Sequence, residues 1–193
     1  MFDVPDDDLL IARARKGDMA AMEALYRSFE TSVYNLGRRL LSSQEEAEDV
    51  LQETFLEVFK SLSRYRGDGH FGGWVRRIAV SKALMRIRAR AGRPEEPLPH
   101  DNLLSSAQPY RPTGDGVLER TRLEAALARL PEQARAVVWL HDVEGFTHDE
   151  IATLFKKSES YSKSQLSRAH ARLRDLMNPV EESMPCTRTA TNF

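Results

Sequence analysis

The hydrophobic residues between Asp6 and Arg90 recur every three to four positions, which predicts helices rather than alternating strands. We expect four helices in this part of the chain. The first runs from about Asp7 to Lys16 and ends at Gly17, and Asp18 caps a longer helix over "MAAMEALYRSFETSVYNLGRRLL". The spacing therefore predicts a helical first half.

The third and fourth helices of this half each bury one face. Ser43 and Glu46 have capping-box spacing, which predicts where the third helix begins. Its apolar stripe consists of Ala47, Val50, Leu51, Phe55, Val58 and Leu62. The segment "RYRGDGH" is predicted to be a loop, and the fourth helix begins near Phe71. The residues expected to be buried on this helix are Trp74, Val75, Ile78 and Ala79.

The segment from Gly92 to Gly116 differs from its surroundings, because five of the nine prolines fall there among glycines and polar residues. This composition predicts a linker. Proline favours extended geometry, so the parts of the chain on either side need not touch.

Helical spacing returns after this segment. The stretch "VLERTRLEAALARL" is amphipathic, Pro131 suits the first position of a second helix, and Gly145 ends that helix. Thr147 and Glu150 form a further capping box, which opens a third helix over "HDEIATLF". A fourth helix starts near Ser160. The predicted fold is therefore all-α, with two helical domains joined by a Pro-rich linker. Its parts are a domain over 6–91, the linker over 92–116, a domain over 117–177 and a flexible tail over 178–193.

Composition narrows the cellular setting. With 28 basic and 29 acidic residues, any nucleic-acid partner must be met by local patches. Cys186 is the single cysteine, which excludes an intramolecular disulfide and favours a reducing compartment. The start "MFDVPDDDLL" lacks the basic region of a signal peptide, and no apolar run approaches the roughly 20 residues of a membrane span. We expect a cytoplasmic protein without membrane insertion.

The last predicted helix has two contrasting faces. Leu166, Ala169, Leu173 and Leu176 share the packing face. The opposite face carries Lys163, Ser164, Ser167, Arg168, Ala171 and Arg172. Small and basic residues let a helix enter a major groove, and the preceding helix has the spacing of a helix-turn-helix. A solvated basic helix is the alternative.

The first half combines basic and aromatic residues. No acidic residue lies between Asp68 and Glu95, where the basic residues are Arg76, Arg77, Lys82, Arg86, Arg88, Arg90 and Arg93. Tyr65, Phe71 and Trp74 lie at the start of this stretch. Such a mixture suits opened DNA, because bases stack on rings while phosphates follow the cations. The alternative is that Phe71 and Trp74 belong to the hydrophobic core.

The third helix is acidic opposite its apolar stripe, at Glu45, Glu46, Glu48, Asp49, Gln52 and Glu53. Charge alone leaves two interpretations open. This face is either solvated or docks on a basic protein partner.

Two long motifs carry a family resemblance. "EEAEDVLQETFLEVFKSL" followed by "RYRGDGHFGGWVRRIAVSKALMRIR" resembles region two of the extracytoplasmic-function (ECF) sigma factors of bacterial RNA polymerase, which belong to the sigma-70 family. "LEAALARLPEQARAVVWLHDVEGFTHDEIATLF" and "SKSQLSRAHARLR" resemble region four of the same family. The resemblance covers roughly residues 8–177. It implies an RpoE-like alternative sigma factor that directs promoter-specific initiation, with no enzymatic activity, cofactor or metal of its own.

The resemblance also implies partners and site residues. The partners are core RNA polymerase, through its beta-prime clamp helices and beta flap, promoter DNA and an anti-sigma factor. Polymerase docking is expected at Glu45, Glu48, Asp49, Gln52 and Glu53. The minus-ten strand is expected at Arg64, Tyr65, Arg66, His70, Trp74, Arg77 and Lys82. The minus-thirty-five duplex is expected at Lys163, Ser164, Gln165, Ser167, Arg168 and Arg172.

The chain departs from the family pattern at three places. Family members often have asparagine where Ser81 stands, a glycine with a β-branched residue at 160–162, and arginine where His170 stands. The promoter bases are therefore not carried over from the resemblance.

Two other classes of protein are weighed against this interpretation. A stand-alone helix-turn-helix regulator would bind duplex DNA tightly without polymerase. A metalloenzyme would need inward Glu-x-x-His pairs, and that spacing is missing. His141 and His148, with Asp142 and Asp149, are expected to be surface or turn residues.

Overall fold

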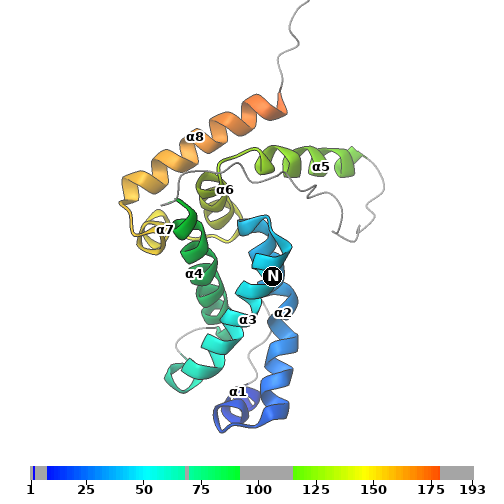
Figure 1. Cartoon of the computed structure of the whole chain (residues 1–193), viewed down its shortest axis with the longest axis vertical. Coiled ribbons are helices and arrows are strands. Elements are labelled where there is room, and N and C mark those ends of the chain that lie inside the picture. The colour runs from blue at the N-terminus through cyan, green and yellow to red at the C-terminus, as the bar shows by residue number, and fades with distance from the viewer. Residues whose placement is uncertain (1, 3–7, 68–69, 92–114, 179–193) are drawn as a thin grey trace, which may run out of the picture.

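The structure is a computed structural model that describes residue 2 and residues 8–67, 70–91 and 115–178, with side chains in the last range described from Arg122 onward. Every regular element in these ranges is helical, as the hydrophobic spacing predicts. We call α1–α4 the first lobe and α5–α8 the second lobe (Figure 1). The predicted linker up to Gly114 and the tail beyond Asn178 lie outside the described residues.

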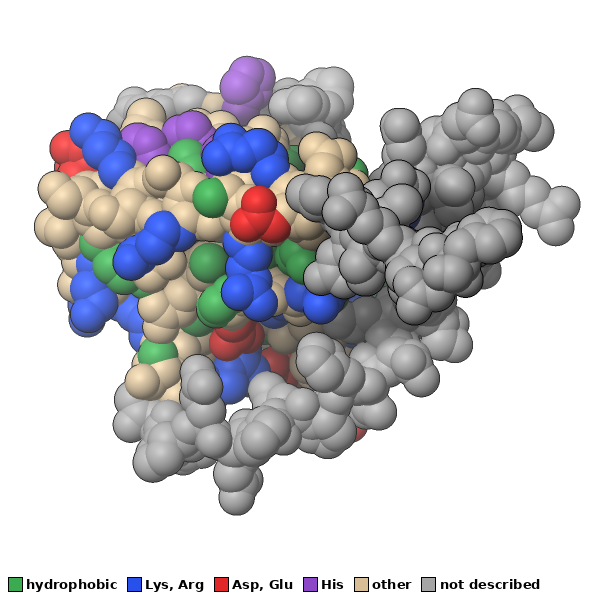
Figure 2. All heavy atoms as spheres, turned by 90° about the horizontal axis from the view of Figure 1, so that it is seen from above, with side chains coloured by type: hydrophobic (Ala, Val, Ile, Leu, Met, Phe, Trp, Pro, Cys, Tyr) green, Lys and Arg blue, Asp and Glu red, His purple; other side chains and the backbone are tan. Residues whose placement is uncertain are grey.

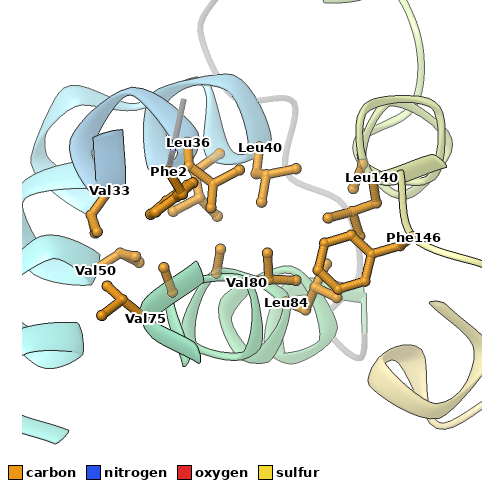
Figure 3. Packing of buried hydrophobic residues seen from close by; sticks show 14 of the residues in the cluster. Phe2, Val33, Leu36, Leu40, Val50, Val75, Val80, Leu84, Leu140 and Phe146 are labelled. Atoms are coloured by element: carbon orange, nitrogen blue, oxygen red, sulfur yellow. The ribbon is translucent and has the colours of Figure 1, made fainter. Parts of the chain in front are cut away.

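The first lobe is built around three long helices. It consists of α1 (Asp8–Arg15), α2 (Met19–Leu41), α3 (Gln44–Ser61), the short 3-10 helix η1 (Leu62–Arg64) and α4 (Phe71–Ala91). Helices α2, α3 and α4 pack against one another, and α1 packs on α2. Val33, Leu36, Val50 and Val75 are fully buried where the three helices meet (Figure 3). The predicted stripe on α3 is this core face, with Leu51 partly buried.

The second lobe is organised by its last helix. It consists of α5 (Asp115–Ala128), α6 (Glu132–Val138), the π-helix η2 (Trp139–Val143), α7 (His148–Phe155) and α8 (Glu159–Met177). Helices α5, α6 and α7 all pack on α8. Leu166 and Ala169 of α8 are buried, and Leu173 packs partly buried against the same cluster.

The predicted helix starts are confirmed at three caps. Asp18 Oδ1 accepts the backbone N–H groups of residues 20 and 21 at 3.0 and 3.2 Å. The Thr147–Glu150 capping box forms completely. At Ser43 one half forms, because its Oγ accepts the Glu46 N–H at 3.3 Å while the Glu46 carboxylate accepts from Arg90.

The predicted helix ends are also confirmed. Gly17 and Gly145 adopt φ angles of +86° and +72°, the left-handed region that glycine reaches without steric cost. Several boundaries differ by one or two residues from their predictions; α5, for example, begins at Asp115, inside the predicted linker. Pro131 is the cap before α6 rather than its first residue, and α8 begins at Glu159 behind the cap Ser158. The π-helix was not predicted from the sequence, because hydrophobic spacing does not separate it from an α-helix.

The sequence left open whether Phe71 and Trp74 are core residues, and the structure places the two rings in different environments. Phe71 is 1% exposed and belongs to the core. Trp74 and Ile78 pack against the core as predicted, but both are only partly buried. The Trp74 ring packs beside Tyr65 and Phe71, with centroid distances of 5.2 and 5.5 Å. Trp74 therefore keeps some of its surface accessible.

The two lobes pack directly against each other, an arrangement that the predicted linker allows but does not require. Helix α2 contacts α6, and α4 contacts α7. Leu140 and Phe146 of the second lobe lie beside Leu40 and Leu84 of the first (Figure 3). The buried apolar cluster is continuous across the seam between the lobes.

Candidate nucleic-acid and partner interfaces

The acidic face of α3 is exposed at every residue that the sequence assigns to polymerase docking, namely Glu45, Glu48, Asp49, Gln52 and Glu53. Leu56 continues this face and is 72% exposed. The face thus presents carboxylates beside an accessible apolar side chain.

Basic residues of α4 hold part of this face in place. Arg86 bridges Asp49 and Glu53 at 3.1 and 2.6 Å. On either side of it along the same helices, Lys82 pairs with Glu57 at 3.6 Å, and Arg90 pairs with Glu46. We call these contacts the α3–α4 ladder. The spacing of four residues between Lys82, Arg86 and Arg90 was a signal for it, because such residues share one helix face.

One of the predicted minus-ten residues, Lys82, belongs to the α3–α4 ladder, and the others do not. Lys82 faces α3, five positions after Arg77 and therefore on a different side of α4. Tyr65 and Trp74 lie together, and Arg15 fixes the loop beside them by donating to the Tyr65 carbonyl at 2.7 Å. Arg64, Arg66 and His70 are exposed near this pair in sequence, while residues 68–69 are outside the described part. The structure therefore groups the aromatic members, while Lys82 pairs with Glu57 of α3.

Arg77 points to the second lobe. Its guanidinium lies 3.2 Å from Glu150, the carboxylate that completes the α7 capping box. The backbone N–H of Thr147 lowers the pKa of Glu150 most, and Arg77 lowers it further. A predicted DNA-binding cation is thus paired with a carboxylate of the same chain.

Neighbouring contacts join the lobes along the same seam. Arg76 donates to the Glu144 carbonyl at 2.9 Å and lies over the Phe146 ring. Arg39 lies over the Trp139 ring, with its guanidinium carbon 4.7 Å from the ring centroid. Arg90, already bound to Glu46, also pairs with Glu132 of α6. Sequence reasoning missed these contacts.

A hollow of about 430 Å³ opens along the seam. It is lined by Phe2, Arg39, His70, Gly73, Arg76, Val143 and Glu144. His70, a predicted minus-ten residue, therefore lines the seam as well.

The predicted duplex-binding face of α8 is exposed. Lys163, Ser164, Ser167, Arg168 and Arg172 are all accessible, whereas Gln165 is half-buried. Two contacts along the helix orient this face: Lys163 pairs with Glu159 at 2.8 Å, and Arg168 donates to the Ser164 carbonyl at 3.2 Å. Figure 2 views this end of the molecule and shows Lys and Arg side chains spread over it beside histidines. Small and basic side chains on the second helix of a helix-turn-helix are suited to a major groove.

The histidines expected at surface or turn positions lie where α7, η2 and α8 meet. His141 and His148 are stacked, with ring centroids 4.5 Å apart. Among the residues that the structure describes, no group of three or more His, Cys, Asp or Glu is arranged to hold a metal ion. No helix in the described part of the chain has both the length and the apolar character to span a membrane.

Comparison with known proteins decides the family. A family model for sigma-70 region 2 matches residues 25–93, and one for sigma-70 region 4 matches residues 120–173. The ECF RNA polymerase sigma factor SigM of Mycobacterium tuberculosis is 30% identical over 172 residues, which cover 89% of this chain and 84% of SigM. The chain belongs to the ECF sigma factors. It is an alternative sigma factor, a protein that directs transcription initiation.

Other relatives of this sigma factor agree. SigE of Mycolicibacterium smegmatis is 36% identical over 168 residues, and the chain spans 64% of its length. The RNA polymerase sigma-H factor of Pseudomonas aeruginosa is 27% identical, with 93% of this chain and 98% of that factor covered.

Two solved structures share its fold. CnrH in complex with the cytosolic domain of CnrY has a TM-score of 0.53 at 23% identity, covering 89% of this chain and 97% of CnrH. RpoE of Bartonella quintana in complex with the anti-sigma factor NepR has a TM-score of 0.56 at 20% identity, covering 82% and 97% of the two chains.

Proposed function

We propose that this sigma factor binds core RNA polymerase through α3, holds the minus-ten strand on the first lobe and reads the minus-thirty-five duplex with α8. The observation that carries the proposal is the exposed face of small and basic residues on α8, directly after the capped helix α7. In this scheme the domains are those predicted from the sequence, 6–91 and 117–177. The protein acts in the cytoplasm and catalyses no reaction itself.

Docking on polymerase depends on the acidic face of α3. Glu45 and Glu48 lie at its exposed start, and Arg86 holds Asp49 and Glu53 in one orientation. Complementary charge steers association with a basic helical surface such as the beta-prime clamp helices. The exposed Leu56 adds an apolar contact that charge alone does not supply.

Strand binding depends on Tyr65 and Trp74. Their partly buried rings are fixed by packing on Phe71, so they offer a stacking surface with little loss of side-chain freedom. The exposed cations Arg64 and Arg66 lie next to Tyr65 in the chain, where phosphates of an unpaired strand would pass. Extruding a base costs a few kcal/mol, which such stacking offsets.

The packed arrangement of the lobes is a resting form in this proposal. Arg77 is needed by the minus-ten strand but is paired with Glu150, and His70 lines the seam. The lobes must therefore separate before both act on DNA. An anti-sigma factor that stabilises the packed form would keep the protein inactive, and the beta flap would favour separation by binding the second lobe.

Reconstitution with core RNA polymerase tests the proposal. The purified chain and core enzyme are combined with genomic DNA, and transcription start sites are mapped at nucleotide resolution. We expect a set of starts that is absent with core enzyme alone and shares upstream sequences at two spaced positions. Tight duplex binding by the chain alone, with no new start site, would instead identify a stand-alone helix-turn-helix regulator.

A further inference from the structure

Three of the five histidines gather with a carboxylate and a buried hydroxyl in the second lobe. We call this group the histidine cluster; its members are His141, Asp142, His148, Ser162 and His170. Asp142 contacts His141 Nδ1 at 2.8 Å through one oxygen and His170 Nε2 at 2.6 Å through the other. His148 Nδ1 lies 3.0 Å from the Oγ of Ser162, a residue with no exposed surface. None of these contacts is used in the proposed function.

The cluster is a continuous chain of contacts that starts and ends on α8. It runs from Ser162 to His148 at the start of α7, crosses the stacked rings to His141 of η2, and returns through Asp142 to His170. Ser162 and His170 are eight residues apart, about 12 Å along the helix. Two separated points on α8 are therefore fixed relative to α7 and η2.

The first of these points adjoins the duplex-binding face. Ser162 immediately precedes Lys163 and Ser164, both exposed and assigned to the DNA. A change in the Ser162–His148 contact would therefore move the end of α8 on which the predicted base contacts begin.

The contacts of His148 favour its neutral form. The groups that face it are His141 and Asp142 from η2, and Glu159 and Lys163 from α8, while Arg77 of α4 reaches the nearby Glu150. Burial lowers the pKa of His148, and the positive charges of His141 and Lys163 lower it further, beyond what Glu159 and Asp142 offset. In the tautomer whose Nδ1 accepts the Ser162 hydroxyl, a proton on Nδ1 would also reverse this bond, so that Ser162 accepts rather than donates.

We propose that the histidine cluster positions α8 and that sequence-specific duplex binding weakens when His148 takes up a proton. This inference rests on the proposed role of α8. Proton uptake also adds positive charge near the DNA, which strengthens binding to any sequence. The quantity affected is therefore the preference for the correct upstream element over a scrambled one.

The test uses the holoenzyme on a promoter from the start-site map, beside the same promoter with a scrambled upstream element. The ratio of the two affinities is measured from pH 7.5 to 5.5. In His148→Asn the amide occupies nearly the place of Nδ1, so the contact with Ser162 is kept without a titrating group. His170→Gln does the same for Nε2 and Asp142, and His100→Asn is the control because His100 belongs to the predicted linker in sequence and is not among the named members of the cluster.

We expect the wild-type preference to fall with acid, by up to about tenfold per pH unit for one linked proton. His100→Asn should follow the wild type, whereas His148→Asn should stay flat. His170→Gln, which keeps the contact with Asp142, should show the pH dependence of the wild type. Parallel profiles for the wild type and His148→Asn would overturn the inference.

A measurement on the unchanged chain keeps the test decisive if a variant does not fold. In an NMR titration of the histidine rings, His148 must take up its proton in the pH interval where the preference is lost. Proton uptake outside that interval contradicts the inference. Absence of any mapped start site is a different result, because it removes the proposed function rather than the role of the cluster.

Discussion

Arg77 on α4 and Glu150 on α7 form an ion pair of 3.2 Å across the two lobes. The same carboxylate accepts the Thr147 N–H at 3.0 Å and so completes a helix cap. One residue therefore serves both the start of the helix-turn-helix and the seam. In the proposed separated form the pair with Arg77 would be lost, whereas the cap, whose atoms all belong to the second lobe, would be kept.

Replacing Glu150 with glutamine should loosen the seam selectively. Glutamine suits the third position of a capping box, so the α7 cap is retained while the charge facing Arg77 is removed. We expect the free protein to bind a single-stranded oligonucleotide up to about fivefold more tightly, the equivalent of ~1 kcal/mol for an exposed pair. Fluorescence anisotropy measures this, with Asp149→Asn as the control. Equal affinities for both variants would show that the pair does not restrict strand binding.

The two lobes should unfold together. The chain has two tryptophans, Trp74 in the first lobe and Trp139 in the second, and the apolar cluster is continuous between the lobes. In each of the single-tryptophan variants Trp74→Phe and Trp139→Phe, the remaining tryptophan reports the unfolding of one lobe. We expect the fluorescence midpoint of each variant to equal the midpoint that circular dichroism gives for the same variant. Urea titrations followed by fluorescence check this. A fluorescence midpoint that differs from the circular dichroism midpoint in either variant would mean that the lobes unfold separately.

Charge reversal on α3 should prevent polymerase binding. Glu48→Lys places a cation on the acidic face without removing either carboxylate that Arg86 bridges. We expect loss of co-elution with core enzyme and unchanged thermal stability. Glu23→Lys, which makes the same change on the exposed side of α2, should bind normally. Normal binding by Glu48→Lys would exclude this face as the docking site.

Removing Arg168 should weaken upstream recognition. If its guanidinium contacts a guanine edge, Arg168→Ala loses about 1–3 kcal/mol for that element. Footprinting of the holoenzyme measures this on the mapped promoter. Arg174→Ala removes an exposed arginine nearer the end of α8 and serves as the control. An unchanged upstream footprint for Arg168→Ala would refute the base contact.

The cap at Asp18 predicts one source of acid sensitivity. A hydrogen bond from Arg13 lowers the pKa of Asp18 most, and the N–H groups of residues 21 and 20 lower it further. Because its folded pKa is depressed, its stabilising effect is present above the ordinary value of 3.8 and is lost as pH falls through the folded value. Asp18→Asn keeps the cap without the charge, so its urea midpoint should fall less between pH 5 and 3. An identical decline in both proteins would contradict this.

The contacts within each lobe were largely predictable from local chemistry. The caps at Asp18 and Thr147 depend on residues two or three positions away, and the α8 faces follow from the helical period. Such features require no knowledge of what lies opposite. The exposed positions of Glu48 and Arg168 were predicted for the same reason, while their partners stay predictions.

The contacts between elements were not predictable in the same way. Lys82 and Arg77 are both basic residues of the same acid-free stretch, and the sequence does not distinguish their surroundings. In the structure Lys82 pairs with Glu57 of α3, whereas Arg77 pairs with Glu150 of α7. Which carboxylate each one meets depends on the rotation of α4 and on the docking of a lobe that follows more than twenty residues later. The basic stretch without acidic residues therefore predicted a nucleic-acid surface, but it did not indicate that some of its cations pair with carboxylates of the same chain.

Different sides of helix α4 pack in the first-lobe core, form the α3–α4 ladder and contact the second lobe at the seam. A substitution on it can disturb more than one process, so the phenotype of an α4 variant does not identify the process by itself. In a genetic screen, suppressors of an α4 defect would be expected in α3 or in the second lobe, according to which side was altered. The position of the suppressor would thereby show which contact of α4 was disturbed, even among variants with the same phenotype.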